Sequence, residues 1–401
     1  SQDPLENNRR FLAMLTKGVD VEVREAAGAR TLKARLLDLE DPTANDFLVA
    51  NQVTVVGKDE RRPDVVAFIN GLPVAVIELK DPTNASATLR TAYNQFQTYR
   101  ERIPALFRFN ALLVVSDGIE AKVGSLTAGW DRYAPWRTVD GEALSTALPL
   151  ETLIRGIFDK ARFVDLIANY QACEVKEGAA KAKKLAGYHQ FHAVRKALAA
   201  TRRAADVQGD RKAGVIWHTQ GSGKSFTMAL YASRLQQEPA LGNPTIVVVT
   251  DRNDLDGQLF STFAEHPDLF VTAPISIDGR DELRSALSGR ASGGIIFTTM
   301  QKFGLQDGET AFPVLSDRRN VIVMADEAHR TQYGFSARVR VGAAAATLTS
   351  GGYAQHLRNA LPQATFIGFT GTPVERKDRN TRAVFGDEID IYDMAQAVAD
   401  N

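Results

Sequence analysis

Apolar residues in the first third of the chain occur in short runs that predict strands. These runs are rich in Val and Ile, which strands favour, and they cover residues 52–56, 64–69 and 74–79. Asn70-Gly71, between the last two runs, predicts a tight hairpin, because both residues tolerate positive φ. A helical pattern follows at about 86–102, and another strand is expected at 111–115. This order of strands, helix and strand predicts a compact α/β domain.

The pattern changes after residue 145. Residues 150–170 carry apolar side chains at helical spacing. Residues 174–184 are rich in Ala, Lys and Glu and hold no aromatic side chain, so we expect a solvated helix or a linker there. The expected domains are an N-terminal domain over 1–145, a helical connector over 146–186 and a second domain over 187–401.

Helical patterns and apolar strands alternate from about residue 187 onward. The expected strands are 213–217, 245–249, 294–298, 321–325 and 365–369. Near-continuous apolar strands that alternate with helices predict a parallel sheet covered by helices on both faces. The second domain is therefore expected to be a doubly covered α/β domain.

Composition narrows the class of protein without deciding its function. Hydrophobic residues make up 44% of the 401 residues, and 48 basic residues balance 48 acidic ones. A zero balance argues against non-specific nucleic-acid coating of the whole surface, but a local basic track is sufficient for phosphate contacts. The single Cys173 excludes an intramolecular disulfide. Because no apolar run is as long as a membrane span and residues 1–20 are too polar for a signal peptide, we expect a cytoplasmic protein.

A phosphate-binding loop is predicted where the strand at 213–217 meets the next helical pattern. Glycines in such a loop let backbone N–H groups curl around phosphate oxygens, and the following helix N-terminus adds positive potential. Lys224 is expected to reach the terminal phosphates of ATP, and Ser225 to hold Mg²⁺. A chance Gly-Ser-Gly loop is the alternative. The expected nucleotide-binding residues here are Thr219, Gln220, Gly221, Ser222, Gly223, Lys224 and Ser225.

Two adjacent carboxylates, Asp326 and Glu327, follow the apolar run at 321–325. Carboxylates at the end of a buried strand are costly unless they meet a cation or a polar ligand. We expect Asp326 to support Mg²⁺, and Glu327 to orient and deprotonate the attacking water. His329 completes the Asp-Glu-Ala-His tetrapeptide and is expected to have a supporting role.

Thr370-Gly371-Thr372-Pro373 follows the last apolar run. With GSGKS and DEAH before it, the sequence resembles superfamily-two helicases and translocases, whose motifs run in this order. The resemblance implies that Thr370 and Thr372 couple nucleotide state to DNA grip. These proteins also place a glutamine ahead of the phosphate loop, and an amide can pair with adenine. Gln190 is therefore the expected adenine reader, with a capping or surface glutamine as the alternative.

Asp64, Glu78 and Lys80 predict a metal-dependent nuclease centre in the N-terminal domain. Glu78 and Lys80 are two apart on a strand and share one face, and Asp64 lies on the other arm of the hairpin. Two carboxylates bind a divalent metal, which polarises a scissile phosphate and activates water, while a lysine stabilises developing charge or positions the nucleophile. An exposed Glu–Lys ion pair of little energetic value is the alternative.

Gln95 and Tyr99 add to this centre, because positions i and i+4 lie on one helix face. A Gln-x-x-x-Tyr pair follows the Glu-x-Lys strand in one branch of such nucleases. The alternative for Tyr99 is structural packing.

Nearly the whole chain resembles the restriction (motor) subunit, HsdR, of type I restriction-modification enzymes. The resemblance rests on stretches such as RRPDVVAFINGLPVAVIELKDP, YNQFQTYR, WHTQGSGKS, ADEAHRTQYG and GFTGTPVE. It implies a PD-(D/E)xK nuclease-like α/β domain followed by a RecA-like P-loop domain, the first lobe of a superfamily-two motor. It also implies that ATP-driven translocation of duplex DNA precedes cutting, with methyltransferase and specificity subunits as partners.

Family members have a second RecA-like lobe, so we expect this chain to be a fragment with nucleotide binding but weak or absent ATPase activity. A stand-alone helicase–nuclease fusion or a type III-like motor is the main rival among enzymes. A rival of another class is a nucleotide-gated DNA-binding scaffold, in which the N-terminal cluster does not cut. Only the specificity and methylation partners would separate the rival enzymes. Metal dependence would separate the scaffold from a nuclease, because a nuclease centre should bind Mg²⁺ or Mn²⁺ through Asp64.

Overall fold

The computed structural model describes residues 3–25, 28–251, 253–306, 309, 311–328, 338–342, 345–349, 353–372 and 379–400. The chain divides into two compact units, Ser1–His192 with Asp400–Asn401, and Ala193–Ala399. Each unit has a central sheet of its own.

The N-terminal unit is built on a five-stranded sheet with the order β3-β6-β7-β8-β9. β6 (Val65–Ile69) and β7 (Leu72–Leu79) form the predicted hairpin. Its turn has positive φ at both central residues, 51° at Asn70 and 77° at Gly71, as a two-residue hairpin turn with right-handed strand twist requires. The strands predicted at 64–69 and 74–79 are therefore confirmed.

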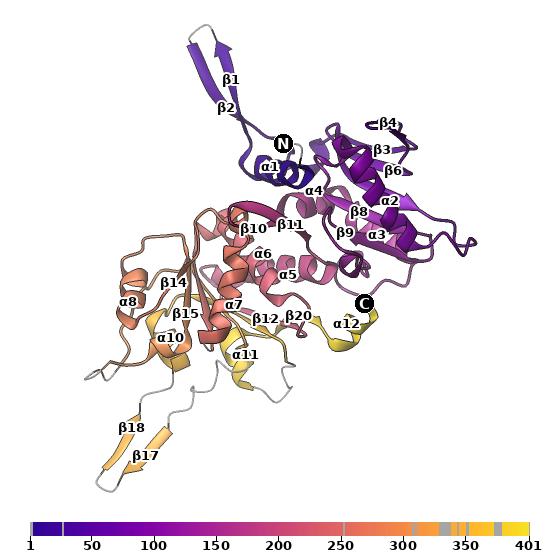
Figure 1. The fold of residues 1–401 in the computed structure, drawn as a ribbon. Coiled ribbons are helices and arrows are strands. Elements are labelled where there is room, and N and C mark those ends of the chain that lie inside the picture. The colour runs from indigo at the N-terminus through magenta and orange to yellow at the C-terminus, as the bar shows by residue number, and fades with distance from the viewer. Residues whose placement is uncertain are drawn as a thin grey trace. The chain divides into compact units, whose positions relative to one another are not determined.

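α2 (Leu89–Arg102) connects β7 to β8 (Leu112–Ser116), and β8 runs parallel to β7. Figure 1 shows this helix lying over the sheet. Its buried face contains Ala92, Phe96 and Tyr99, at helical spacing, and packs against the apolar residues of one sheet face. Gln95, one position before Phe96, is thereby held near the carboxyl end of β7. The predicted helix at 86–102 and strand at 111–115 are confirmed.

The predicted strand at 52–56 is wrong over its first three residues, and only Val55–Val56 forms a strand. Backbone φ is 51° at Gln52, so the extended chain breaks there and the Gln52 N–H donates to the carbonyl oxygen of Asp64 at 3.0 Å. Two strands flank the break, β3 (Phe47–Asn51) and β4 (Val55–Val56). The remaining elements of this unit are α1 (Pro4–Lys17), β1 (Val19–Glu25), β2 (Gly28–Ala34), β5 (Glu60–Arg61), β9 (Ala121–Gly124), α3 (Pro149–Ile157), α4 (Lys160–Asn169), β10 (Gln171–Lys176) and β11 (Ala179–Leu185).

The solvated helix or linker expected at 174–184 is also wrong, because the segment is most of an antiparallel hairpin. β10 pairs with β11 through a turn at Glu177 and Gly178, with φ of 54° and 78°. The side chain of Lys183 is buried, and its Nζ donates to Oδ1 of Asn8 at 2.7 Å. The side chain of Asn8 is itself buried on α1. Tertiary burial therefore overrides the local preference of an Ala/Lys-rich segment.

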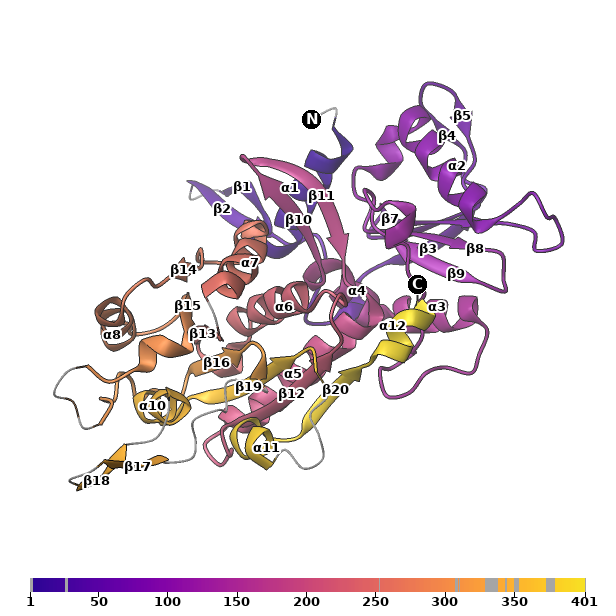
Figure 2. The ribbon, with the colours of Figure 1, turned by 60° about the horizontal axis from the view of Figure 1, so that its bottom comes forward.

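The C-terminal unit contains the predicted parallel sheet. Seven described strands are ordered β14-β15-β13-β16-β19-β12-β20, and every neighbouring pair is parallel. Figure 2 shows the strands in this order. Its apolar strands are fully buried, as helices on both faces require. The five strands that the sequence predicts here are all confirmed.

The helices of this region are α5 (Tyr188–Ala205), which spans the division between the units, α6 (Lys224–Gln236), α7 (Asn253–Ala264), α8 (Arg280–Ser288), α10 (Tyr353–Ala360), α11 (Arg379–Phe385) and α12 (Met394–Asp400). The strands are β12 (Lys212–His218), β13 (Thr245–Thr250), β14 (Ile275–Ser276), β15 (Ile295–Thr299), β16 (Val321–Ala325), β17 (Arg338–Gly342), β18 (Ala345–Thr349), β19 (Thr365–Thr370) and β20 (Glu388–Tyr392). Over the described residues, no helix combines the length and apolarity that a membrane span requires.

Candidate active sites

The loop between β12 and α6 has the backbone that a phosphate-binding motif needs. Gly221 and Gly223 have φ of 83° and 82°, a region that glycine enters without steric cost. A Cβ at Gly221 would meet no heavy atom within 4 Å, so the backbone conformation rather than lack of space requires glycine. The N–H and Oγ of Ser222 both donate to the carbonyl oxygen of Thr219, at 3.3 and 2.7 Å. Ser225 lies in the first turn of α6.

Lys224 lies between the two carboxylates that follow β16. Its Nζ lies 3.2 Å from Oδ1 of Asp326 and 2.8 Å from Oε1 of Glu327. All three side chains are less than a fifth exposed, at 16%, 12% and 18%. Burial opposes the charge on Lys224, but the two carboxylates outweigh it and raise the pKa of the ammonium group. Residues about a hundred positions apart in sequence thus form one compact charge cluster.

The two carboxylates differ in their surroundings. Burial and the neighbouring charge of Glu327 raise the pKa of Asp326, and Lys224 opposes that rise. Glu327 has a φ of 49°, and its N–H donates to Oδ1 of Asp326 at 3.0 Å. A non-glycine residue with positive φ at such a position is strained and needs support from its neighbours. His329 and Pro373 lie outside the described residues.

The third motif lies against the phosphate loop. A Cβ built on Gly371 would lie 3.3 Å from Cγ of Gln220 and 3.8 Å from Nζ of Lys224. The N–H of Thr372 donates to Oγ1 of Thr370 at 3.2 Å. The structure therefore brings Thr370 and Thr372 to the candidate nucleotide site, while their coupling role stays a prediction.

Gln190 lies in the first turn of α5 and is buried. Its Oε1 accepts a hydrogen bond from the backbone N–H of Gly187 at 3.0 Å. This contact is of the capping kind that sequence reasoning kept as the alternative. The adenine-reading role stays a prediction.

Sequence reasoning missed a polar cluster at the start of the phosphate loop. Asp390, on β20, accepts from Nζ of Lys196 at 3.0 Å and lies 2.9 Å from Nε2 of His218. The side chains of His218 and Asp390 are 0% and 9% exposed. An adjacent backbone bond joins the N–H of Thr219 to the carbonyl oxygen of Tyr392 at 2.9 Å. Only the fold reveals this cluster, because 172 positions separate His218 from Asp390.

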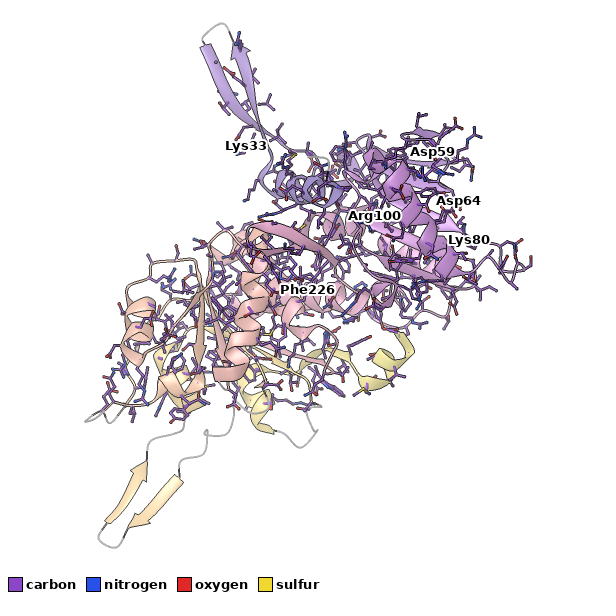
Figure 3. All side chains as sticks on the ribbon, in the orientation of Figure 1. Lys33, Asp59, Asp64, Lys80, Arg100 and Phe226 are labelled. Carbon is purple, nitrogen blue, oxygen red and sulfur yellow. The ribbon has the colours of Figure 1, made fainter. Side chains whose placement is uncertain are left out.

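The predicted nuclease residues also lie together, in the N-terminal unit. Nζ of Lys80 donates to Oε1 of Glu78 at 3.1 Å and to Oε1 of Gln95 at 2.8 Å. Nε2 of Gln95 donates in turn to the hydroxyl of Tyr99 at 2.5 Å. Oδ2 of Asp64 accepts from the N–H of Leu79, the residue between Glu78 and Lys80, at 2.8 Å. Figure 3 labels Asp64 and Lys80 on the same side of this unit.

Among the residues of this cluster, Glu78 has the least favourable surroundings for a negative charge. Its side chain is 1% exposed, and Oε2 has no hydrogen-bond partner among the described residues. Burial raises its pKa to about 7, with Lys80 lowering it and Asp64 raising it further. Burial and the nearby Glu78 also raise the pKa of Tyr99 to about 12. Two interacting carboxylates, one of them with a buried oxygen that lacks a hydrogen-bond partner, fit a divalent cation, which would remove the repulsion between them.

This donor set is small. No group of three or more His, Cys, Asp and Glu side chains suited to a metal occurs in the described ranges, so backbone or water ligands would complete the site around Asp64 and Glu78. One contributor was not predicted: Nε2 of Gln52 donates to Oδ1 of Asp64 at 3.0 Å. The sequence offers no signal for Gln52, since its run of residues has the pattern of a continuous strand.

Comparison with known proteins finds a matching family model for each of the two units. The model for the SWI2/SNF2 ATPase matches residues 189–401, and the model for the type I restriction enzyme R protein N terminus matches residues 1–132. The chain belongs to the SWI2/SNF2 ATPase family. The fold prediction is thus confirmed as an α/β HsdR N-terminal domain followed by a SWI2/SNF2 ATPase domain with a parallel sheet.

Relatives of this SWI2/SNF2 ATPase support the resemblance to HsdR. The type I restriction enzyme HindI endonuclease subunit of Haemophilus influenzae is 44% identical over 99% of this chain and 38% of the relative. The SsaAORF53P endonuclease subunit of Staphylococcus saprophyticus is 27% identical over 99% of this chain and 41% of the relative. The chain therefore spans about two fifths of the length of these relatives. The predicted relationship to the R (HsdR) endonuclease subunits of type I restriction enzymes is confirmed.

A solved structure of the ATP-dependent Type ISP restriction-modification enzyme LlaBIII bound to DNA is also similar. It shares 13% identity and a TM-score of 0.37, over 84% of this chain and 21% of that protein. A likeness of this size adds nothing to the assignment.

Proposed function

We propose that this chain supplies the nuclease centre and the first motor lobe of a type I restriction endonuclease subunit. Residues 1–145 would be the PD-(D/E)xK nuclease domain, 146–186 the connector, and 187–401 the first RecA-like lobe. The subunit would work in the cytoplasm with methyltransferase and specificity subunits. It would translocate duplex DNA with ATP and cut unmethylated DNA away from the recognition site. The observation that carries this proposal is that one chain holds two separate clusters of buried, opposed charges, each at a predicted site.

The nuclease role rests on Asp64, Glu78 and Lys80. Asp64 and Glu78 would hold Mg²⁺, which supplies polarisation of the scissile phosphate and an activated water when it is bound. Lys80 is fixed by Glu78 and by Gln95, so its charge is held where negative charge develops on the phosphate. Gln95 and Tyr99 act by positioning Lys80 rather than by contacting the reacting atoms.

The ATPase role rests on Lys224, Asp326 and Glu327. Lys224 would exchange its carboxylate contacts for the terminal phosphates of ATP, and Ser225 and Asp326 would hold Mg²⁺. Glu327 would orient and deprotonate the attacking water. The loop from Thr219 to Gly223 would bind phosphate oxygens through backbone N–H groups. Gln190 would read adenine, and Thr370 and Thr372 would link the nucleotide to DNA grip.

The test reconstitutes the subunit that carries this sequence with its methyltransferase and specificity subunits. Cleavage of unmethylated circular DNA and ATP hydrolysis are measured with ATP and Mg²⁺, for wild type, Lys224→Ala and Glu78→Ala. Glu60→Ala serves as the control, because Glu60 forms an exposed ion pair with Arg62 and its side chain is 54% exposed. We expect Lys224→Ala to lose hydrolysis and cutting, Glu78→Ala to lose cutting alone, and Glu60→Ala to keep both.

Normal cutting by Glu78→Ala would remove the nuclease from the N-terminal domain and leave a nucleotide-gated DNA-binding scaffold. Normal hydrolysis by Lys224→Ala would contradict the assignment of the motor. Cutting without the methyltransferase and specificity subunits would favour a stand-alone helicase–nuclease.

A further inference from the structure

Two cations that have no carboxylate partner lie over one aromatic ring of the N-terminal unit. Cζ of Arg90, in the first turn of α2, is 5.6 Å from the centroid of the Trp130 ring, and Nζ of Lys122, on β9, is 5.4 Å from it. Within the part of the chain that the structure describes, neither side chain makes an ion pair or a hydrogen bond. Their donors therefore remain available to an anion.

The strand register connects this pair to the candidate nuclease centre. Val115 on β8 is paired with Glu78 on β7 and with Lys122 on β9. Residues in register on neighbouring strands point to the same face of a sheet, so Glu78 and Lys122 both face α2. Two strand spacings separate them by about 10 Å. Each strand of duplex DNA carries one phosphate per about 3.4 Å of helix axis, so a separation of this size lies within the span of a few neighbouring nucleotides.

The ring also keeps the two cations in place. Trp130 stacks on Tyr133 with ring centroids 6.0 Å apart and an interplanar angle of 23°, and Tyr93 meets its edge at 5.8 Å. Long cationic side chains lose rotamer freedom when they bind a phosphate. A cation held over a fixed indole has already lost part of that freedom, so less is lost on binding. This arrangement suits anion binding better than two freely moving lysines would.

We propose that Arg90 and Lys122, held by Trp130, form a phosphate-binding subsite for the DNA strand presented to Asp64 and Glu78. The inference rests on the proposed nuclease function and adds the direction in which the strand leaves the centre, toward β9 and the first turn of α2. In this subsite Arg90 and Lys122 contact the phosphates of the DNA backbone, whereas Trp130 is a positioning residue that holds the two cations.

Binding of the chain to a duplex oligonucleotide tests this subsite, with EDTA present so that no strand is cut. The affinity is measured over a range of salt concentrations for wild type and for the double variant Arg90→Gln, Lys122→Gln. Each lost phosphate contact should lower the slope of log affinity against log salt by about 1, so we expect a fall of about 2. Arg155→Gln is the matched control, because Arg155 forms an exposed ion pair with Glu151 on α3, and it should keep the wild-type slope.

A second readout separates phosphate binding from packing. Trp130→Phe keeps a ring for the cations and should keep most of the slope, whereas Trp130→Leu should lose part of it. A wild-type slope in the double variant, with or without a lower thermal unfolding midpoint, overturns the subsite and leaves the nuclease proposal standing. Failure of the wild-type chain to bind DNA at all would count against both.

The geometry also points to Asp390 as a positioning residue for the phosphate loop. Asp390 holds His218, the residue that leads into the loop, and the backbone bond from Thr219 to Tyr392 fixes the next residue to the same strand. An ionised carboxylate only accepts hydrogen bonds, so Nε2 of His218 carries the proton and the ring orientation is set. Among the described strands, β20 lies at the edge of the sheet and pairs with β12. The entry to the loop is thus fixed by the edge strand as well as by β12.

Asp390→Asn tests this role, because it keeps the shape of the side chain and removes its charge. Affinity of the chain for a fluorescent ATP analogue with Mg²⁺ is measured beside thermal unfolding. The matched control is Glu238→Gln, since Glu238 is also buried, 7% exposed, and also pairs with a residue of α5, Arg202. A positioning role predicts about tenfold weaker nucleotide binding for Asp390→Asn alone. A purely structural role predicts that both variants lose stability and neither loses affinity.

His218→Gln, which keeps an N–H donor for Asp390, should retain most of the affinity that His218→Leu loses. Equal nucleotide affinities for Asp390→Asn and Glu238→Gln would overturn the positioning role. The nucleotide site itself would still stand, provided that the wild-type chain binds the analogue. A wild-type chain that does not bind the analogue overturns the nucleotide site and the positioning role together.

Discussion

Oε1 of Glu78 accepts from Nζ of Lys80 at 3.1 Å, while the other oxygen of the same carboxylate, Oε2, is buried with no hydrogen-bond partner among the described residues. The lysine therefore satisfies only half of the carboxylate. The charge of the nearby Asp64 adds to the burial that raises the pKa of Glu78. A proton or a divalent cation would relieve this repulsion, and each of these two possibilities leads to a separate prediction.

We expect the metal-free chain to lose stability as pH rises from 5 to 8. Glu78 has a pKa of about 7 in the folded state against 4.5 for the ordinary group, so the folded state binds the proton more tightly. Stability from this group is full below pH 4.5 and is lost as pH rises through 7, by an amount on the order of 3 kcal/mol. Thermal unfolding across this range measures it, and Glu78→Gln should flatten the curve while Glu60→Gln should not.

Divalent cations should compete with that proton. Mg²⁺ or Mn²⁺ should raise the unfolding midpoint of the chain at pH 8, where Glu78 is ionised, and have less effect at pH 5. Asp64→Asn should abolish the rise at pH 8. An equal rise at both pH values, or in the variant, would mean that the cation binds elsewhere.

Lys224→Met should destabilise the chain even without nucleotide. The change leaves Asp326 and Glu327 as adjacent buried carboxylates with no compensating ammonium group, which costs about 3 kcal/mol for a broken buried pair. The loss should shrink at pH 5, because proximity and burial favour protonation of Asp326. Chemical denaturation measures the difference. Lys33→Met is the control, since Lys33 and Asp20 form an exposed pair, 63% and 62% exposed, worth at most about 1 kcal/mol.

The same substitution, glycine to alanine, should have opposite signs at two positions of the ATPase domain. Gly221→Ala forces an L-residue into φ of 83° and should cost about 1–2 kcal/mol, with weaker ATP binding. Gly257→Ala lies within α7, where a Cβ would meet nothing within 4 Å, and should stabilise by up to about 1 kcal/mol. Equal effects in denaturation experiments would show that Gly221 does not adopt the phosphate-loop conformation in solution.

Lys183 should make stability rise with pH above neutrality. Burial lowers its pKa to about 7 from 10.5, so the unfolded chain takes up the proton first as pH falls. The neutral lysine is favoured in the folded state, and stability should therefore increase from pH 7 to pH 10. Lys183→Met should remove that increase in thermal unfolding experiments. Lys181→Met, at an exposed position of the same strand, should leave it unchanged.

Local patterns predicted most of the fold because the relevant residues express strong local preferences. Runs of Val and Ile, the Asn70-Gly71 turn and the glycines of the phosphate loop each restrict the backbone within a few residues. Composition failed at 174–184, where the Glu177-Gly178 turn and the buried Lys183 outweigh an Ala/Lys-rich sequence that favours helix. Propensity is a weak guide once tertiary burial is available.

The candidate sites divide in the same way. Motif spacing predicted Asp64, Glu78, Lys80, Lys224 and the two carboxylates after β16, because each belongs to a short stretch whose chemistry is legible alone. Gln52 and Asp390 could not be predicted, since each acts on a partner that only the folded sheet brings near. Long-range hydrogen bonds of this kind leave no periodic trace in a sequence.

The placement of β12 in its sheet bears on the order in which the protein can mature on the ribosome. Both neighbours of this strand, β19 and β20, are encoded well over a hundred residues after it. At about 5–20 residues per second of synthesis, the strand that carries the phosphate loop waits on the order of ten seconds or more for either neighbour. Throughout that interval its N–H and C=O groups are open to wrong partners. The nascent ATPase domain therefore needs the edges of this strand protected until β19 and β20 have been made.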